Sequence, residues 1–142
     1  MESNDEPEKK QKGVVAVETA LVLPLLLLIV FGIVEFGLAL YDQAVITNAA
    51  REGARAGIVL TSPRPTTTDI TSVVTGYTSS YLISFAAKNP TPSVSVTNAG
   101  GSFGTALAVK VSYTFTGLLL GPLMNPLTGP ITLSSTATMN NE

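Results

Sequence analysis

Two carboxylates, Glu18 and Glu35, interrupt an otherwise apolar run of 27 residues from Val14 to Leu40. An ionisable side chain inside a membrane-length apolar segment is costly unless it is paired, so its default interpretation is functional. The chemistry open to both is the binding of a positive group, because a desolvated carboxylate needs such a partner. The alternatives are simpler: Glu18 lies at the inner edge of a membrane, and Glu35 lies at the outer edge.

The rest of the chain offers little for catalysis. Its 142 residues include no histidine and no cysteine, which removes the commonest general base, the commonest metal ligand and any thiol nucleophile. Beyond the apolar run the only lysines are Lys88 and Lys110, and neither lies in a serine-spaced motif. Asp42, Glu52 and Asp69 are too scattered to predict a metal site. We predict a protein that is not an enzyme and that uses no cofactor and no metal.

The charge distribution excludes nucleic acid and predicts a membrane orientation. The net charge is −2, and no basic patch or phosphate-binding motif is present beyond Lys9, Lys10 and Lys12. These lysines precede the apolar run, and the next positive charge after it is Arg51. Lysine and arginine favour the cytoplasmic side, so the N-terminus is predicted to be cytoplasmic and the residues after about 40 to lie outside.

The apolar run is long enough to span a membrane. As a helix its 27 residues measure about 40 Å, and a bilayer core is about 30 Å thick. The alternative is a removable signal sequence, whose apolar region would be only about 7–15 residues long. We therefore predict a retained single-pass helix with membrane lipid as one of its partners. Pro24 inside the run is compatible with this, because membrane helices tolerate proline.

The organisation predicted from these patterns is α+β. Residues 1–13 form a cytoplasmic leader, disordered through residue 12, residues 14–40 form the transmembrane helix, and residues 41–142 form an extracytoplasmic domain. Within that domain the periodicities predict helices over 41–60 and 67–88, and antiparallel strands near 93–98, 105–116 and 130–139. Between the last two strands, residues 117–130 form an unusually apolar loop, predicted to pack on the domain, the membrane or a neighbouring subunit.

A row of small residues, Ala49, Gly53 and Gly57, recurs every four positions in the first helix of the predicted domain. Such a row allows another helix to approach closely. Two interpretations stay open: the row packs inside its own domain, or it packs against another subunit. The second half of the chain also favours subunit contacts, because after residue 60 it has only five charged residues among many serines and threonines. A domain with O-linked sugar is the alternative there.

The spacing of Gly13 and Glu18 before an apolar helix resembles the processing site of type IV pilin-like proteins. A longer pattern is similar to the TadE-like family of the tight-adherence (Flp) pilus system, and it covers about residues 13–57. The pattern consists of Gly13, Glu18, Leu23-Pro24, Phe31-Gly32, Glu35 and the string NAAREGARAG over 48–57.

This resemblance implies specific roles. A prepilin-type peptidase would cut after Gly13 and make Val14 the new N-terminus, and Glu18 would pair with the α-amine of a neighbouring subunit. It also implies a pilin-like fold and a structural function, as a minor pilin or pseudopilin that assembles with other pilin subunits at the bacterial cytoplasmic membrane. Two alternatives remain at this stage: an unprocessed membrane-anchored assembly component of the same system, and a membrane-tethered extracellular binding module.

Overall fold

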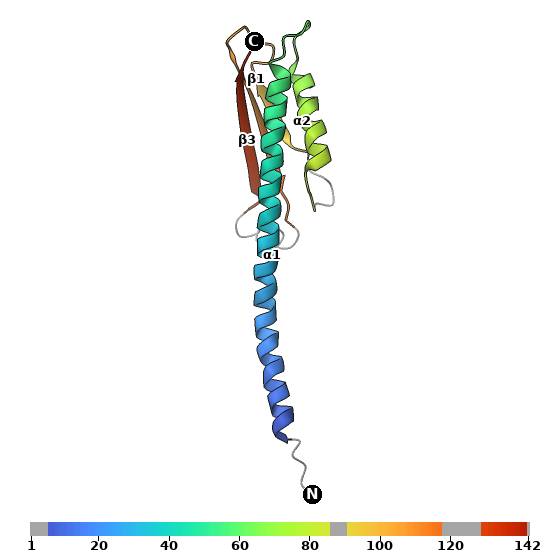
Figure 1. Cartoon of the computed structure of the whole chain (residues 1–142), viewed down its shortest axis with the longest axis vertical. Coiled ribbons are helices and arrows are strands. Elements are labelled where there is room, and N and C mark those ends of the chain that lie inside the picture. The colour runs from blue at the N-terminus through green and yellow to red at the C-terminus, as the bar shows by residue number, and fades with distance from the viewer. Residues whose placement is uncertain (1–5, 86–90, 118–128, 142) are drawn as a thin grey trace. The chain divides into compact units, whose positions relative to one another are not determined.

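The computed structural model describes residues 6–85, 91–117 and 129–141. It divides the chain into two compact units, Met1–Val34 and Glu35–Glu142. The elements are two helices followed by three strands, which confirms the predicted α+β class (Figure 1). Their bounds are α1 Glu6–Gly57, α2 Thr67–Tyr81, β1 Ser93–Thr97, β2 Ala106–Phe115 and β3 Ile131–Asn140.

The described part of the first unit is the N-terminal part of α1. It begins at Glu6, so it includes part of the leader that the sequence predicts to be disordered. Glutamate, lysine and glutamine are good helix formers, and Pro7 lies in the first turn, where its missing N–H group costs nothing. From Val14 to Val30 every side chain is exposed, and the helix continues past Pro24. In the described part of the chain, this is the one helix long and apolar enough to cross a membrane.

In the second unit, three antiparallel strands form a sheet in the order β1-β2-β3, and the helices cover one of its faces (Figure 1). The central strand, β2, pairs with both neighbours. Val111 of β2 lies opposite Val94 of β1 on one side and opposite Ser135 of β3 on the other. Buried and exposed residues alternate along β2, as expected for a sheet with one covered face. The open face of the sheet carries mainly serine and threonine, together with Lys110.

The core lies between the sheet and the two helices. Its members come from α1, α2 and the inward face of β2, and all are less than one-tenth exposed. They are Ile46, Ala49, Ala50, Ala54, Ile70, Val74, Leu107, Val109, Val111, Tyr113 and Phe115. The helix residues that contribute to this core are small or β-branched, so the backbones of α1 and α2 can lie close to the sheet.

Helix α2 begins with a capping box. Thr66 Oγ1 accepts a hydrogen bond from the Asp69 backbone N–H at 3.3 Å, and the Asp69 carboxylate accepts one from the Thr66 backbone N–H at 2.9 Å. These bonds satisfy two backbone donors that the helix end leaves unpaired. Within the helix, the buried Thr78 hydroxyl donates to the Val74 carbonyl at 3.0 Å, which explains how a polar side chain lies in the core.

Helix α2 is shorter than the sequence predicts. The expected helix runs to residue 88, but the observed one ends at Tyr81, and residues 86–90 lie outside the described part of the chain. Leu82 is extended, with φ −68° and ψ 136°, and the next backbone N–H, that of Ile83, donates to Asp42 of α1. A tertiary hydrogen bond therefore replaces the next helical one. The apolar loop predicted over 117–130 also lies mostly outside the described residues.

Candidate functional site: the carboxylates and small residues of helix α1

The predicted processing site lies on an exposed stretch of α1. Val14 is 67% exposed, and a Cβ atom added to Gly13 would have no neighbour within 4 Å. A peptidase must straighten the backbone that it cuts, and glycine lowers helix stability by about 1 kcal/mol relative to alanine. The Gly13–Val14 peptide bond is thus accessible, and it lies where the helix is easily opened.

Glu18 is exposed on the same unit and lies at the edge of a shallow hollow of about 300 Å³. The hollow is otherwise lined by Thr19, Val22, Leu23 and Leu26. The Thr19 hydroxyl donates to the Val15 carbonyl at 2.8 Å, so this neighbour is satisfied within the helix. Glu18 therefore presents a carboxylate beside an apolar surface. This arrangement suits a positive group carried by another apolar segment.

Glu35 differs from Glu18 in its surroundings. It is only 7% exposed and lies at the start of the second unit. Glu35 is thus buried within the chain, whereas Glu18 is exposed. A role for Glu35 in assembly stays a prediction, and Glu18 is the carboxylate of the apolar run that a neighbouring subunit can reach.

The row Ala49, Gly53 and Gly57 faces the interior of the second unit. All three residues are buried. A Cβ atom at Gly53 would lie 2.5 Å from Val74 Cγ2 of α2, and one at Gly57 would lie 2.5 Å from Leu107 Cδ2 of β2. Such distances are far below van der Waals contact, so glycine allows α1 to lie directly on α2 and β2. Of the two interpretations of this row, the structure shows the internal one, and the function of the row in assembly stays a prediction.

Two buried polar groups were not predicted as a pair from the sequence. Asp42 of α1 is 0% exposed, and its Oδ1 atom accepts a hydrogen bond from the Ile83 backbone N–H at 3.0 Å. The Oδ2 atom of Asp42 has no hydrogen-bond partner within the described residues. Burial raises the pKa of Tyr113, the Ser84 side chain lowers it by less, and the charge of Asp42 raises it further. The one available signal in the sequence was an acidic residue, Asp42, at the start of the predicted helix over 41–60.

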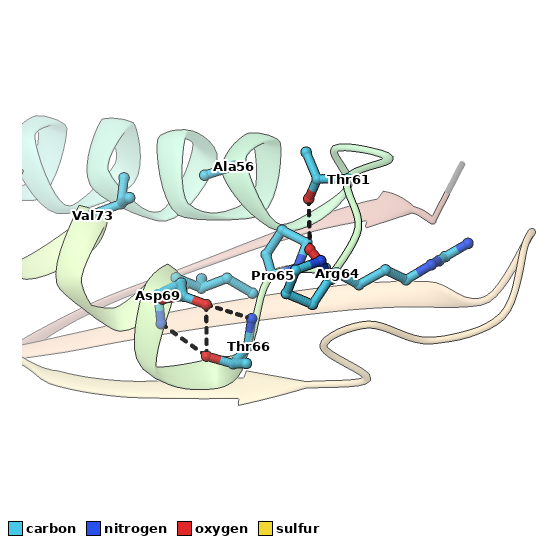
Figure 2. Close-up of a pocket in the computed structure, with 9 residues that line it drawn as sticks. Ala56, Thr61, Arg64, Pro65, Thr66, Asp69 and Val73 are labelled. Atoms are coloured by element: carbon cyan, nitrogen blue, oxygen red, sulfur yellow. Dashed lines mark hydrogen bonds between the residues drawn. The ribbon is translucent and has the colours of Figure 1, made fainter.

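The loop between the helices forms a pocket of about 300 Å³, shown in Figure 2. Its wall includes Ala56, Pro65 and the capping pair Thr66 and Asp69. The hydrogen bonds from Thr66 hold the pKa of Asp69 below its usual value, because they favour the ionised carboxylate. Arg64 donates to the Gly101 carbonyl, which ties this loop to the β1–β2 connection. The polar groups named here serve structural bonds, and we assign the pocket no chemistry.

The described residues contain no group of three or more acidic, histidine or cysteine side chains that could hold a metal ion. What the arrangement offers is a surface for association: an exposed carboxylate on an apolar helix, attached to a small packed domain.

One known family model matches part of the chain. The family model described as TadE-like protein matches residues 13–55, which confirms the resemblance noted in the sequence. The match covers the apolar run, both of its carboxylates and the start of the small-residue row. No curated protein and no solved structure matches the chain significantly.

Proposed function

We propose that this TadE-like chain is a structural subunit, a minor pilin or pseudopilin, of a tight-adherence pilus or of the machinery that assembles it. Helix α1 anchors it in the bacterial cytoplasmic membrane as a single pass, with the N-terminus in the cytoplasm and the second unit outside. Its partners are other pilin or pseudopilin subunits, a prepilin-type peptidase and membrane lipid.

The observation that carries the proposal is the exposed position of Glu18. A carboxylate that faces lipid is costly, and a positive partner removes most of that cost. If the chain is cut after Gly13, the α-amine of Val14 is such a group, and it lies at the end of an equivalent helix in a neighbouring subunit. Glu18 lies four positions after Val14, so a modest axial shift between two parallel helices brings the two groups together.

The first experiment measures the mature N-terminus. Intact-mass analysis of the protein from its native host should show Val14 as the first residue. A Gly13→Leu variant should remain full length, because a bulky side chain replaces the residue at the cut. Recovery of only full-length wild-type protein, with the peptidase present, would contradict processing and favour the unprocessed assembly component.

The second experiment separates assembly from folding. Glu18→Ala and Glu18→Gln should both lose co-purification with partner subunits, because neither carries the charge that pairs with an α-amine. The second unit should remain folded in both. Glu52→Gln is the matched control, since Glu52 is an exposed carboxylate of the same helix outside the apolar run. If Glu18→Ala assembles like wild type, pairing at Glu18 is refuted, and a tethered binding module becomes the better interpretation.

A further inference from the structure

Strand β3 forms an outer edge of the sheet (Figure 1), and its hydrogen bonds show which of its backbone groups face outward. Directly after β3, Asn141 donates its N–H to the Thr105 carbonyl at 2.9 Å and accepts from the Gly104 N–H at 2.8 Å, so its backbone faces β2. Backbone direction alternates along a strand, so the even-numbered residues of β3 face away from β2. The Gln43 side chain of α1 donates to the Ser134 carbonyl at 3.1 Å, which agrees with this assignment.

The second half of this outer edge is open. Helix α1 reaches the edge at Ser134, but a Cβ atom at Gly57 would lie 2.5 Å from Leu107 Cδ2 of the central strand. The helix therefore crosses from β3 toward β2 and leaves the end of β3 uncovered. Among the described residues, the outward N–H and C=O groups beyond Ser134 have no hydrogen-bond partner. We call these groups the free edge, and they belong to Thr136, Thr138 and Asn140.

Strand β3 carries none of the features that usually protect a sheet edge. Natural edge strands are kept from pairing by charged side chains, proline, bulges or short length. The ten residues Ile131–Asn140 include no charge and no proline, and they pair with β2 in one continuous register. The other outer strand, β1, has only five residues, and α2 packs against it. The free edge is thus suited to accept an extended segment of another chain.

The two faces of β3 determine which segment fits. The side chains of Thr136, Thr138 and Asn140 are exposed on the open face of the sheet, whereas Ala137 and Met139 pack against the core on the other face. A second copy of β3, antiparallel and centred on Thr138, places Thr138 opposite its counterpart and Thr136 opposite Asn140. Polar side chains then meet polar ones, and threonine pairs of this kind are favourable. Since β3 carries no charge, two copies meet without like-charge repulsion.

We propose that the free edge binds β3 of a second copy of this chain, which joins the two three-stranded sheets into one of six strands. Three opposed residue pairs then exchange two backbone hydrogen bonds each. One strand pair is smaller than the interface of about 1,200 Å² that a stable complex needs, so we expect association that is weak and depends on concentration. This inference concerns the second unit alone and does not rest on the pilin assignment.

The test uses single-cysteine variants of the full chain, because the natural sequence contains no cysteine. Thr138→Cys places a thiol at the centre of the pairing, where opposed Cα atoms are about 5.5 Å apart, as a disulfide requires. Ser95→Cys is the matched control, since Ser95 is exposed on the same face but lies on β1. In the joined sheet its two copies are five strand spacings apart, about 24 Å. Each variant is solubilised in detergent, oxidised mildly and separated on a non-reducing gel.

Two further variants test the register. Thr136→Cys and Asn140→Cys face each other across the two copies, whereas the two copies of either one are about 13 Å apart along the strands. Only a mixture of the two variants should therefore form the disulfide. Adding Thr136→Pro to the Thr138→Cys chain removes an outward N–H and no bond to β2, a position where edge strands tolerate proline. It should lower the yield of dimer to that of Ser95→Cys.

We expect Thr138→Cys to form several times more disulfide dimer than Ser95→Cys, with a yield that rises with protein concentration. Equal yields from these two variants would overturn the proposal. Dimer from Thr136→Cys alone, in the same yield as from its mixture with Asn140→Cys, would also overturn it. Near-UV circular dichroism checks the fold of the proline variant, and if that variant is unfolded the cysteine variants alone decide. None of these outcomes depends on the peptidase or on Glu18, so the proposed function stands or falls separately.

Discussion

Replacing Gly53 by alanine tests whether glycine is required for close packing of α1. The added Cβ would lie 2.5 Å from Val74 Cγ2 and 3.4 Å from Val109 Cγ1. Valine is stiff at χ1, so Val74 cannot rotate away easily, and one of the two helices must shift. Overpacking of this kind costs about 1–3 kcal/mol. Alanine also raises helix propensity by about 1 kcal/mol, which offsets part of that cost.

Gly76→Ala is the matched control. Gly76 lies in the interior of α2, and a Cβ atom there would have no neighbour within 4 Å. It should therefore show only the gain in helix propensity, about 1 kcal/mol. Since both variants share that gain, the difference between them isolates the packing cost. We expect Gly53→Ala to have a free energy of unfolding about 1–3 kcal/mol below that of Gly76→Ala.

The assay is urea unfolding of the full chain in nanodiscs, followed by near-UV circular dichroism. All four tyrosines, Tyr41, Tyr77, Tyr81 and Tyr113, lie in the second unit, so the signal reports on that unit. In thermal unfolding, a difference of 1 kcal/mol corresponds to about 4–8 °C for a domain of this size. If Gly53→Ala is as stable as Gly76→Ala, the close approach of α1 to α2 is refuted.

Three further outcomes are expected from the polar bonds of the second unit. Thr66→Ala should lower the free energy of unfolding by about 1 kcal/mol, because it removes the N-cap of α2, and urea titration measures this. The pKa of Asp69 is lower in the folded chain than its ordinary 3.8, so its stabilising effect is present above that pH and is lost as the pH falls through the folded pKa. Asp69→Asn should therefore show a smaller acid-induced loss of thermal stability than wild type, and equal losses would contradict the capping box as its source. Asp42→Ala should cost about 1–3 kcal/mol by leaving the Ile83 N–H unpaired, whereas Asp42→Asn keeps an acceptor and should cost less; equal losses in the two variants would refute this hydrogen bond.

The sequence alone determined the parts of this protein that depend on local pattern. The length of the apolar run predicted the helix that contains Gly13 and Glu18. The alternation of apolar and polar residues predicted each end of β2 to within one residue. These features depend on the periods of the helix and the strand, which are visible along the chain. The family resemblance rested on the same segment, and the matched residues 13–55 lie within it.

Only the tertiary structure decided which residues each face of a helix contacts. The small-residue row was visible in the sequence, but its spacing is the same whether Gly53 faces α2 or another subunit. Glu35 and Glu18 look alike in the apolar run, yet Glu35 is buried and Glu18 is exposed. Helix α2 ends early because Asp42, which is far from it in sequence, binds the Ile83 N–H. Each of these depends on contacts between residues distant along the chain, and local periodicity carries no information about such contacts.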